Sequence, residues 1–310
     1  MESPLKGRHF LSVADFSTEE IARLLDTAHR VKEHPADYAD RMKRKTLAMI
    51  FQKPSLRTRV SFEAGMTQMG GHAIYLAPSD VSMGTRETPE DTALVLSRFA
   101  DAIMARVFGH DIVEELARHA TVPVINGLSD FEHPCQILAD LQTIVERKGR
   151  LEGLHGCYIG DGNNVAHSLM YGAARMGMHL TVITPEGYAP ADEVTEKAQE
   201  IGRATGARIA TTSDLDAVSG ADVLYTDVWA SMGQEAEAEA RKRIFQRYRI
   251  DAEIMKAVHT EAIILHCLPA HYGDEIDYAT SRLPNAAIFD QAENRLHAQK
   301  ALLLHLIGET

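Results

Sequence analysis

Several short segments of the chain carry side chains that could bind an anion, polarise a carbonyl group or hold an amine. The first is Pro54–Arg59 (PSLRTR), which lies between an apolar run and an amphipathic run. We predict a helix N-terminus there, whose free N–H groups and positive dipole end suit a phosphate. Ser55 and Thr58 add hydroxyl donors, and the planar guanidinium of Arg57 matches phosphate oxygens. The segment is a candidate phosphate site, although a capped surface helix has the same pattern.

Two further segments of the first half could act on a carbonyl group. Arg106 lies near the end of the apolar run 102–107, and such a residue can point to the sheet edge where ligands bind in open α/β folds. His133 opens the sequence HPCQ and could donate a hydrogen bond to a polarised oxygen as an electrostatic catalyst. Gln136, one helical turn on, could hold a neutral amide. The structural alternatives are a rim salt bridge for Arg106 and a helix cap for His133.

The segment Gly160–Asn164 (GDGNN) resembles half of a dinucleotide-binding fingerprint, and Glu186 falls where a ribose-binding acid would lie. These features are the basis of one alternative, a nicotinamide-dependent oxidoreductase. Val165 holds the third glycine position, however, and two amide side chains stand where a pyrophosphate needs bare backbone. The amides could instead bind the head group of an amino acid.

Two segments of the second half suit an amine. Asp227 follows an apolar run in DVWASMG, where its carboxylate could bind an ammonium group or cap a helix, and Ser231 and the backbone near Met232 could take other polar ends. Cys267 lies in HCLP and could contact an amine or act as a nucleophile. A nucleophilic thiol needs a base, and His266 points to the opposite strand face by alternation. We therefore interpret Cys267 as a polar contact, with a buried structural thiol as the alternative.

Apolar runs that alternate with amphipathic stretches predict the elements that position these residues. A capping box at Ser17 predicts a helix to about Lys32, and Pro134 suits a first helical turn. Glu146–Gly153 is the best candidate boundary between two α/β lobes, each a doubly wound parallel sheet of similar size. Expected strands are 46–52, 72–77, 102–107, 123–128, 157–160, 179–185, 222–228, 262–269 and 286–291, and further expected helices are 55–70, 88–100, 134–147, 164–176, 190–205, 236–249 and 293–307.

Composition excludes several classes of protein. The formal net charge of −12 over 310 residues argues against a nucleic-acid partner, which needs a basic surface. Three cysteines without CxxC spacing, and histidines without an HExxH frame, argue against disulfides and against a metal site. No apolar run approaches membrane-spanning length and the N-terminus lacks a signal-peptide pattern, so we expect a cytoplasmic protein with no membrane partner.

The joint order of these segments resembles the aspartate/ornithine carbamoyltransferase family nearly end to end, and DxxxSMG with HCLP is similar to its ornithine branch. The resemblance implies transfer of a carbamoyl group from carbamoyl phosphate to the side-chain amine of L-ornithine. Residues 1–147 with the C-terminal helix 293–310 would bind carbamoyl phosphate, and residues 148–292 would bind ornithine. No metal or organic cofactor is expected, because carbamoyl phosphate is already activated.

The resemblance also implies roles for individual residues. Arg57, Arg106, His133 and Cys267 would be the catalytic set, and Asn164, Asp227, Ser231 and Met232 would bind ornithine. Carbamoyl phosphate would be held by Ser55, Leu56, Arg57, Thr58, Ser82, Arg106, His133, Pro134, Cys135, Gln136, Cys267, Leu268 and Arg295.

Two positions depart from the pattern of the family's ornithine branch, which often has threonine where Leu56 stands. A backbone contact there would tolerate the change. The family takes a phosphate contact from a neighbouring subunit, often through His or Gln, and Ser82 is a shorter side chain at that position, with Arg86 as a substitute. The family implies a homotrimer or a multiple of trimers. The remaining alternatives are another acceptor (aspartate, putrescine or an acylated ornithine) and a non-catalytic binding module.

Overall fold

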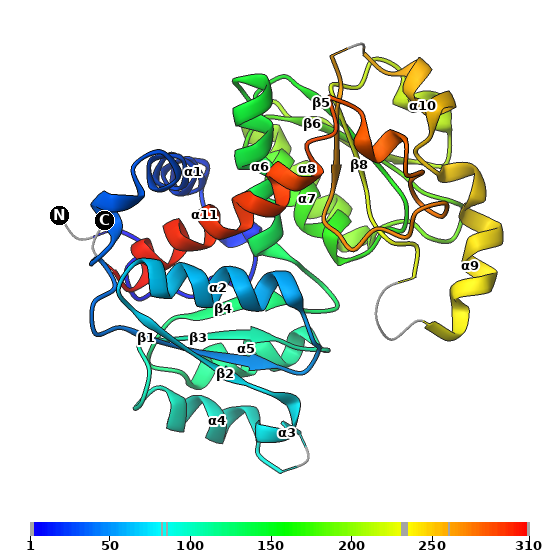
Figure 1. Cartoon of the computed structure of the whole chain (residues 1–310). Helices are drawn as coiled ribbons and strands as arrows, with labels where there is room; N and C mark the ends of the chain where they lie inside the picture. The colour runs from blue at the N-terminus through cyan, green and yellow to red at the C-terminus, as the bar shows by residue number, and fades with distance from the viewer. Residues whose placement is uncertain (1–2, 82, 85, 231–234, 260, 309–310) are drawn as a thin grey trace. The chain divides into compact units, whose positions relative to one another are not determined.

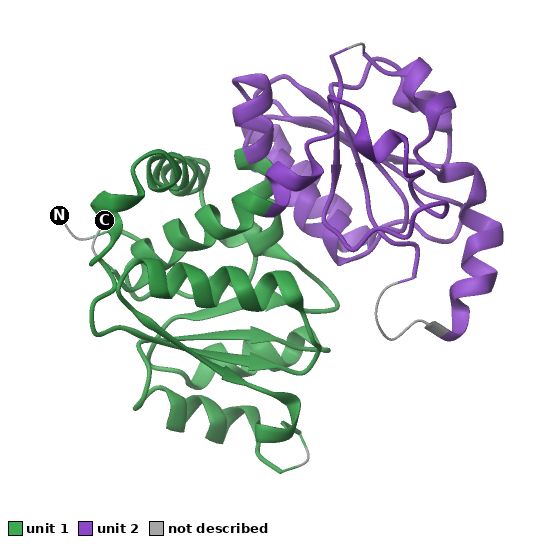
Figure 2. Cartoon of the chain, in the orientation of Figure 1, with its two compact units in different colours: residues 1–142, 293–310 green, residues 143–292 purple. Residues whose placement is uncertain are grey.

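The computed structural model describes residues 3–81, 83–84, 86–230, 235–259 and 261–308 (Figure 1). The chain divides into two compact units, one made of residues 1–142 and 293–310 and the other of residues 143–292 (Figure 2). Helices α6 (Pro134–Lys148) and α11 (Ile288–Leu306) each contain residues of both units. No helix in the described ranges is long and apolar enough to cross a bilayer.

The first unit contains a parallel sheet of β1 (Thr46–Phe51), β2 (His72–Leu76), β3 (Ala102–Arg106) and β4 (Val124–Leu128). The strand order is β2-β1-β3-β4, so the chain leaves β1 in one direction for β2 and then crosses to the other side for β3. Ligands bind at such a switch point, beyond the carboxyl ends of the strands, because the loops that follow the two strands diverge there. Residues after β1 and after β3 therefore lie at the edge that favours binding.

Helices cover this sheet on both faces. Figure 1 shows α2 over one face and α4 over the other. The side chains of Ile50, Ile103, Val113 and Leu116 belong to the buried cluster that joins β1, β3 and α5. Ser17 caps α1 with the predicted capping box, in which Ser17 and Glu20 bond to each other's backbone. The helices of this unit are α1 (Thr18–Glu33), α2 (Leu56–Gln68), α3 (Pro78–Val81), α4 (Pro89–Leu96) and α5 (His110–His119), with parts of α6 and α11 and short 3-10 turns at Val13–Asp15 and Pro35–Tyr38.

The second unit contains a parallel sheet in the order β7-β6-β5-β8-β9, whose switch point lies between β5 and β8. Gly160–Asn163 follows β5, and Asp227 follows β8, so both predicted polar segments reach this point. The strands are β5 (His155–Ile159), β6 (His179–Ile183), β7 (Ile209–Thr212), β8 (Val223–Thr226) and β9 (Ile263–His266). The helices are α7 (Asn164–Arg175), α8 (Asp192–Thr205), α9 (Ala238–Phe245) and α10 (Ala252–Ala257), with 3-10 turns at Leu215–Val218, Glu235–Glu237, Gln246–Tyr248 and Thr280–Arg282.

The fold class predicted from the sequence, two doubly wound parallel-sheet lobes joined by helices, is confirmed. The predicted strand 286–291 is wrong. Ala286 makes a single bridge to Ile264, and α11 begins two residues later at Ile288. A short apolar run fits a strand or a buried helical turn equally well, so periodicity could not separate them. Strand β7 and helices α3, α5 and α10 were not predicted.

Candidate active site

The loop after β1 forms the helix N-terminus that the sequence predicts at Ser55. Ser55 is the N-cap of α2, and its Oγ accepts a hydrogen bond from the backbone N–H of Thr58 at 3.3 Å. Thr58 is buried, whereas the Leu56 side chain is 73% exposed. Because the Leu56 side chain points to solvent, only the backbone N–H of Leu56 is left to contact a ligand. The N-terminus of α2, with its positive dipole end, therefore lies at the switch point of the first unit, where it favours an anion.

Arg295, from α11, joins two other helices of the first unit in its interior. Its side chain is 2% exposed, and it donates to Gln136 Oε1 at 2.7 Å and to Thr58 Oγ1 at 3.3 Å. The amide nitrogen of Gln136 donates in turn to Asp140 Oδ1 at 2.8 Å. This network brings a permanent cation from the C-terminal part of the chain next to α2 and the start of α6. Three residues predicted from separate segments are thus in direct contact.

His133 lies among arginines directly before α6. Its ring is buried, and burial lowers its pKa well below the ordinary value. The charges of Arg295, Arg106 and Arg57 lower that pKa further, because each opposes a second positive charge. His133 is therefore neutral near pH 7 and can act as a hydrogen-bond donor to oxygen without carrying charge.

Arg106 ends β3 at an irregularity in the register between β3 and β4. Its side chain is buried, and its carbonyl accepts from the N–H of Gln52 at 2.8 Å, which ties the end of β3 to the end of β1. The irregularity changes the strand pairing at Arg106, whose side chain the sequence predicts to face the switch point. Arg106 thus lies at the strand end where the sequence placed it.

The neighbours of these residues have mainly structural contacts. Pro134 opens α6. The Cys135 thiol is fully buried, donates to the carbonyl of Asn126 at 3.4 Å and has a pKa that burial raises to about 12.

Sequence reasoning missed Lys53, two residues beyond β1, which is 8% exposed with its Nζ 4.5 Å from the centre of the Phe108 ring. The sequence offered one signal for this residue, a lysine that follows an apolar strand. The structure makes the residue notable because buried lysines are rare.

In the second unit, the buried Asp227 is the centre of a part-buried hydrogen-bond cluster. The amide of Asn163 donates to its Oδ2 at 2.9 Å, and the thiol of Cys267 donates to its Oδ1 at 3.0 Å. The Oδ1 atom of Asn163 accepts from the N–H groups of Val165 and Ala166, so Asn163 caps α7. Asn163 is thereby engaged in capping α7 and in contacting Asp227, while Asn164 is the half-buried first residue of the helix.

The loop after β9 is held by a buried histidine and glutamate. His266 Nε2 lies 3.0 Å from Glu275 Oε1, both side chains are inaccessible to solvent, and His266 Nδ1 accepts from the N–H of Leu268 at 2.9 Å. The ring proton therefore belongs on Nε2, facing the carboxylate. Leu268 has a positive φ of 60°, a backbone region that non-glycine residues rarely adopt. Sequence reasoning missed Glu275, which no local motif marks.

The predicted set thus falls into two groups. Ser55, Thr58, Arg106, His133, Gln136 and Arg295 lie at or beside the switch point of the first sheet, and Asn164, Asp227, Cys267 and Leu268 follow the strands of the second. Ser82, Ser231 and Met232 lie outside the described residues. Ligand-type atoms of Asp227, His266 and Cys267 approach within 4.8 Å of one another, but both nitrogens of His266 already have the partners named above.

A dinucleotide site at Gly160–Asn164 is disfavoured by packing. A Cβ atom at Gly162 would lie 2.2 Å from the backbone nitrogen of Pro190, so this glycine is required by the close approach of two loops. The N–H of Gly162 donates to the carbonyl of Tyr188 at 2.9 Å. The backbone that a pyrophosphate would contact is therefore used within the protein.

Two family models match consecutive parts of the chain. Residues 8–146 match the carbamoyl-phosphate-binding domain of aspartate/ornithine carbamoyltransferase, and residues 152–306 match its aspartate/ornithine-binding domain. An ornithine carbamoyltransferase of Oceanobacillus iheyensis is 51% identical over 99% of this chain and 97% of its own length. An anabolic ornithine carbamoyltransferase of Pyrococcus furiosus is also 51% identical, over 98% of each chain.

Solved structures agree with these sequence matches. The ornithine carbamoyltransferase of Pyrococcus furiosus superimposes with a TM-score of 0.96 at 50% identity and covers 99% of each chain. The anabolic enzyme of Campylobacter jejuni gives a TM-score of 0.91 at 38% identity, covering 96% of this chain and 97% of its own. Together with the matched domains, these similarities span both units and both switch points, and the chain belongs to the aspartate/ornithine carbamoyltransferase family.

Proposed function

We propose that this protein transfers the carbamoyl group of carbamoyl phosphate to the side-chain amine of L-ornithine, giving L-citrulline and phosphate. The observation that carries the proposal is the division of polar residues between the two switch points. Cations and neutral donors gather at the first, and an acid, an amide and a thiol gather at the second. Relatives about half identical over the full length carry the name of this activity.

In this proposal the first unit, with the C-terminal part of α11, binds carbamoyl phosphate. The N–H groups of α2 from Leu56 onward, the hydroxyls of Ser55 and Thr58, and the guanidinium of Arg57 would hold the phosphate. Arg106 would bridge phosphate and carbonyl oxygen, while Arg295 adds a buried positive charge beside Thr58. His133 and Gln136 would bind the carbamoyl oxygen and amide, with Pro134 and Cys135 contributing through the start of α6.

The second unit would bind ornithine. The carboxylate of Asp227 suits the α-ammonium group, and its contacts with Asn163 and Cys267 fix its orientation. Asn164 would bind the α-carboxylate, with Ser231 and Met232 completing the head-group contacts as the sequence predicts. Cys267 and Leu268 would lie near the carbamoyl group and the attacking amine, where the Leu268 backbone is fixed by its bond to His266.

The chemistry then follows from the charges. The lone pair of the neutral δ-amine attacks the carbonyl carbon, and negative charge grows on the carbonyl oxygen. Arg106, Thr58 and His133 would stabilise that charge as fixed donors. The bond from carbon to the phosphate oxygen then breaks, phosphate leaves with the electron pair into the cationic site, and the proton that the amine nitrogen loses is accepted by the departing phosphate, giving hydrogen phosphate. The acyl phosphate supplies the driving force, so the step requires no further cofactor.

Assembly and location complete the proposal. We expect a homotrimer or a multiple of trimers, and a cytoplasmic protein. Analytical ultracentrifugation of the full chain tests the trimer, with a monomeric species at enzyme-assay concentration as the contradicting result.

An acceptor panel tests the activity. The protein is incubated with carbamoyl phosphate and, separately, ornithine, aspartate, putrescine or N-acetylornithine, and the carbamoylated products are identified by mass spectrometry. We expect citrulline to form at a far higher kcat/KM than any other product. A preference for another amine would reassign the acceptor while keeping the first unit's role, and the absence of any carbamoylated product would overturn the proposal.

A further inference from the structure

A buried arginine outside the predicted site connects the two loops of the second switch point. Arg241 lies on α9 and is 7% exposed. Its Nη1 contacts Asp161 Oδ2 at 2.9 Å and donates to the carbonyl of Trp229 at 2.9 Å, while its Nε contacts Glu237 Oε2 at 3.0 Å. Asp161 follows β5 and Trp229 follows β8, so one guanidinium holds both loops.

The two loop residues that Arg241 contacts are close in sequence to the two residues that form the central hydrogen bond of the site. Asp161 is two residues before Asn163, and Trp229 is two residues after Asp227. The bond from Asn163 Nδ2 to Asp227 Oδ2 is therefore one tie between the loops, and the guanidinium of Arg241 is the second. With both ties in place, the carboxylate of Asp227 has a fixed position and orientation.

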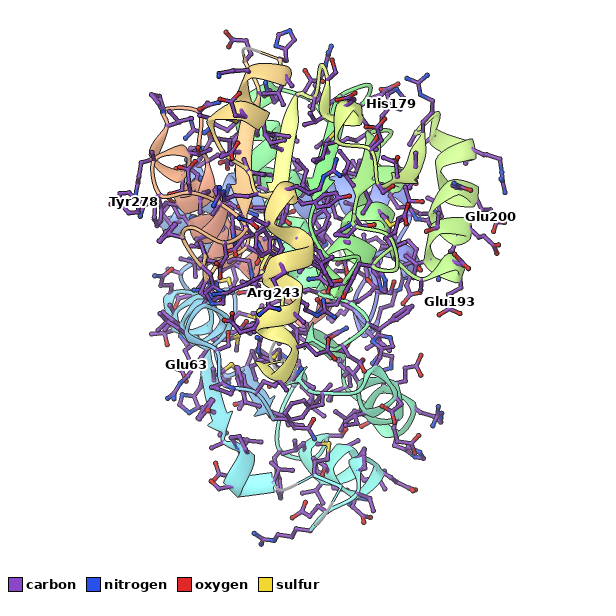
Figure 3. All side chains as sticks on the ribbon, turned by 90° about the vertical axis from the view of Figure 1, so that its right-hand side faces the viewer. Glu63, His179, Glu193, Glu200, Arg243 and Tyr278 are labelled. Carbon is purple, nitrogen blue, oxygen red and sulfur yellow. The ribbon has the colours of Figure 1, made fainter. Side chains whose placement is uncertain are left out.

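Arg241 is itself fixed by aromatic packing. Its guanidinium lies 5.0 Å from the centre of the Tyr188 ring, which packs edge-on against Phe245 of the same helix at 4.8 Å. Phe245 also stacks on Trp229 at 5.8 Å. Figure 3 shows α9 with the exposed Arg243 labelled two residues along the same helix. The buried and exposed arginines of one helix thus offer a test residue and a matched control.

We propose that Arg241 is a positioning residue for the amino-acid acceptor. It acts through Asp161 and the Trp229 carbonyl to hold Asp227 in the geometry that binds the ammonium group. The inference rests on the proposed function, because it assumes that Asp227 binds ornithine. It concerns the second unit alone, so loss of Arg241 should weaken ornithine use and leave carbamoyl phosphate use unchanged.

The Asp161 carboxylate gives this tie a pH dependence. Burial raises the pKa of Asp161 to about 6, and the charge and hydrogen bond of Arg241 oppose that rise, while Asp227 and Glu237 add to it. A raised pKa means that Asp161 becomes protonated as the pH falls through about 6, and the ion pair with Arg241 is then lost. The advantage of the wild-type protein over Asp161→Asn in ornithine use should therefore shrink in that range.

Steady-state kinetics of Arg241→Gln, Arg241→Lys and Asp161→Asn test the proposal, with Arg243→Gln as the control. We expect Arg241→Gln to raise the KM for ornithine about 10- to 100-fold, the loss typical of a removed hydrogen bond to a charged group. The KM for carbamoyl phosphate should change less than about twofold, and Arg241→Lys should recover part of the loss. The ratio of wild-type to Asp161→Asn kcat/KM should fall toward one below about pH 6.

Two results would overturn the inference. One is an ornithine KM of Arg241→Gln equal to that of Arg243→Gln. The other is an equal rise in both KM values with a lower unfolding temperature, which would make the arginine merely structural. If Arg241→Gln does not fold, Asp161→Asn decides by the same KM split. The wild-type and Arg243→Gln proteins report separately on the proposed function, because neither would form citrulline if that function were wrong.

Discussion

Replacing His133 by alanine should lower kcat for carbamoyl transfer while leaving the fold intact. The side chain is buried directly before α6, and burial together with Arg295, Arg106 and Arg57 lowers its pKa well below the ordinary value. It is therefore a neutral donor throughout the useful assay range. Removing a single donor to a developing oxyanion costs about 10²–10³ in kcat. We expect a loss of that size for His133→Ala.

A second variant separates a neutral donor from an acid or base. His133→Gln keeps an uncharged N–H at similar reach, so it should retain more kcat than the alanine variant, on the order of tenfold. A general acid or base could not be replaced by an amide, because an amide does not titrate in this range. In both variants the rate of citrulline formation should fall at acid pH as it does in the wild-type protein, since His133 does not titrate in that range.

The assay is the initial rate of citrulline formation from about pH 5.5 to 9, with both substrates saturating. NMR of the histidine-labelled protein follows His133 directly. A His133 resonance that titrates between pH 6 and 7, or a glutamine variant as inactive as the alanine variant, would refute the reasoning.

Three further predictions concern other parts of the account. Arg106→Ala should abolish turnover with an unchanged circular dichroism spectrum, and retained turnover would contradict its role at the switch point. Gly162→Ala should lower stability by about 1–3 kcal/mol in thermal unfolding, because its Cβ would meet Pro190 N at 2.2 Å, whereas Gly65→Ala meets nothing closer than 3.4 Å. The kcat/KM for ornithine should rise with pH, because its side-chain amine is protonated near neutrality and only the neutral form attacks; a flat profile would count against that mechanism.

Local chemistry allowed much of the first site to be predicted. The pattern from Pro54 to Arg59 joined a strand end to a helix start, and the structure has Ser55 as the N-cap of that helix. Such features depend on residues close in sequence, so a short segment contains the whole signal. The contact of Arg295 with Gln136 and Thr58 is different, because it joins α11 to segments more than 150 positions away. The resemblance to the family implied only that Arg295 contacts the phosphate, and these contacts with Gln136 and Thr58 were not predicted.

The features missed by sequence reasoning depend on tertiary packing. Glu275 follows no spacing rule, and only burial distinguishes it from a surface charge, while Lys53 is marked in the sequence only by its place after an apolar strand. Arg241 lies in a strongly charged stretch that looks solvent-exposed throughout, yet the fold buries one arginine of that stretch against Asp161. The strand predicted at 286–291 failed for a related reason, since the apolar residues around Ile288 begin a buried helix. Burial of a charge or of a helical turn is set by neighbours distant in sequence.

The central claim, that a carbon–nitrogen bond forms between the carbamoyl group and the side-chain amine of ornithine, can be observed directly. Ornithine labelled with ¹⁵N at the δ position is mixed with ¹³C-carbamoyl phosphate and the wild-type protein, and ¹³C NMR follows the reaction. We predict a new carbonyl signal split by one-bond coupling to ¹⁵N, with one phosphate released for each citrulline formed. A carbonyl product without that coupling, or phosphate release with ¹³C appearing only as bicarbonate, would contradict the account.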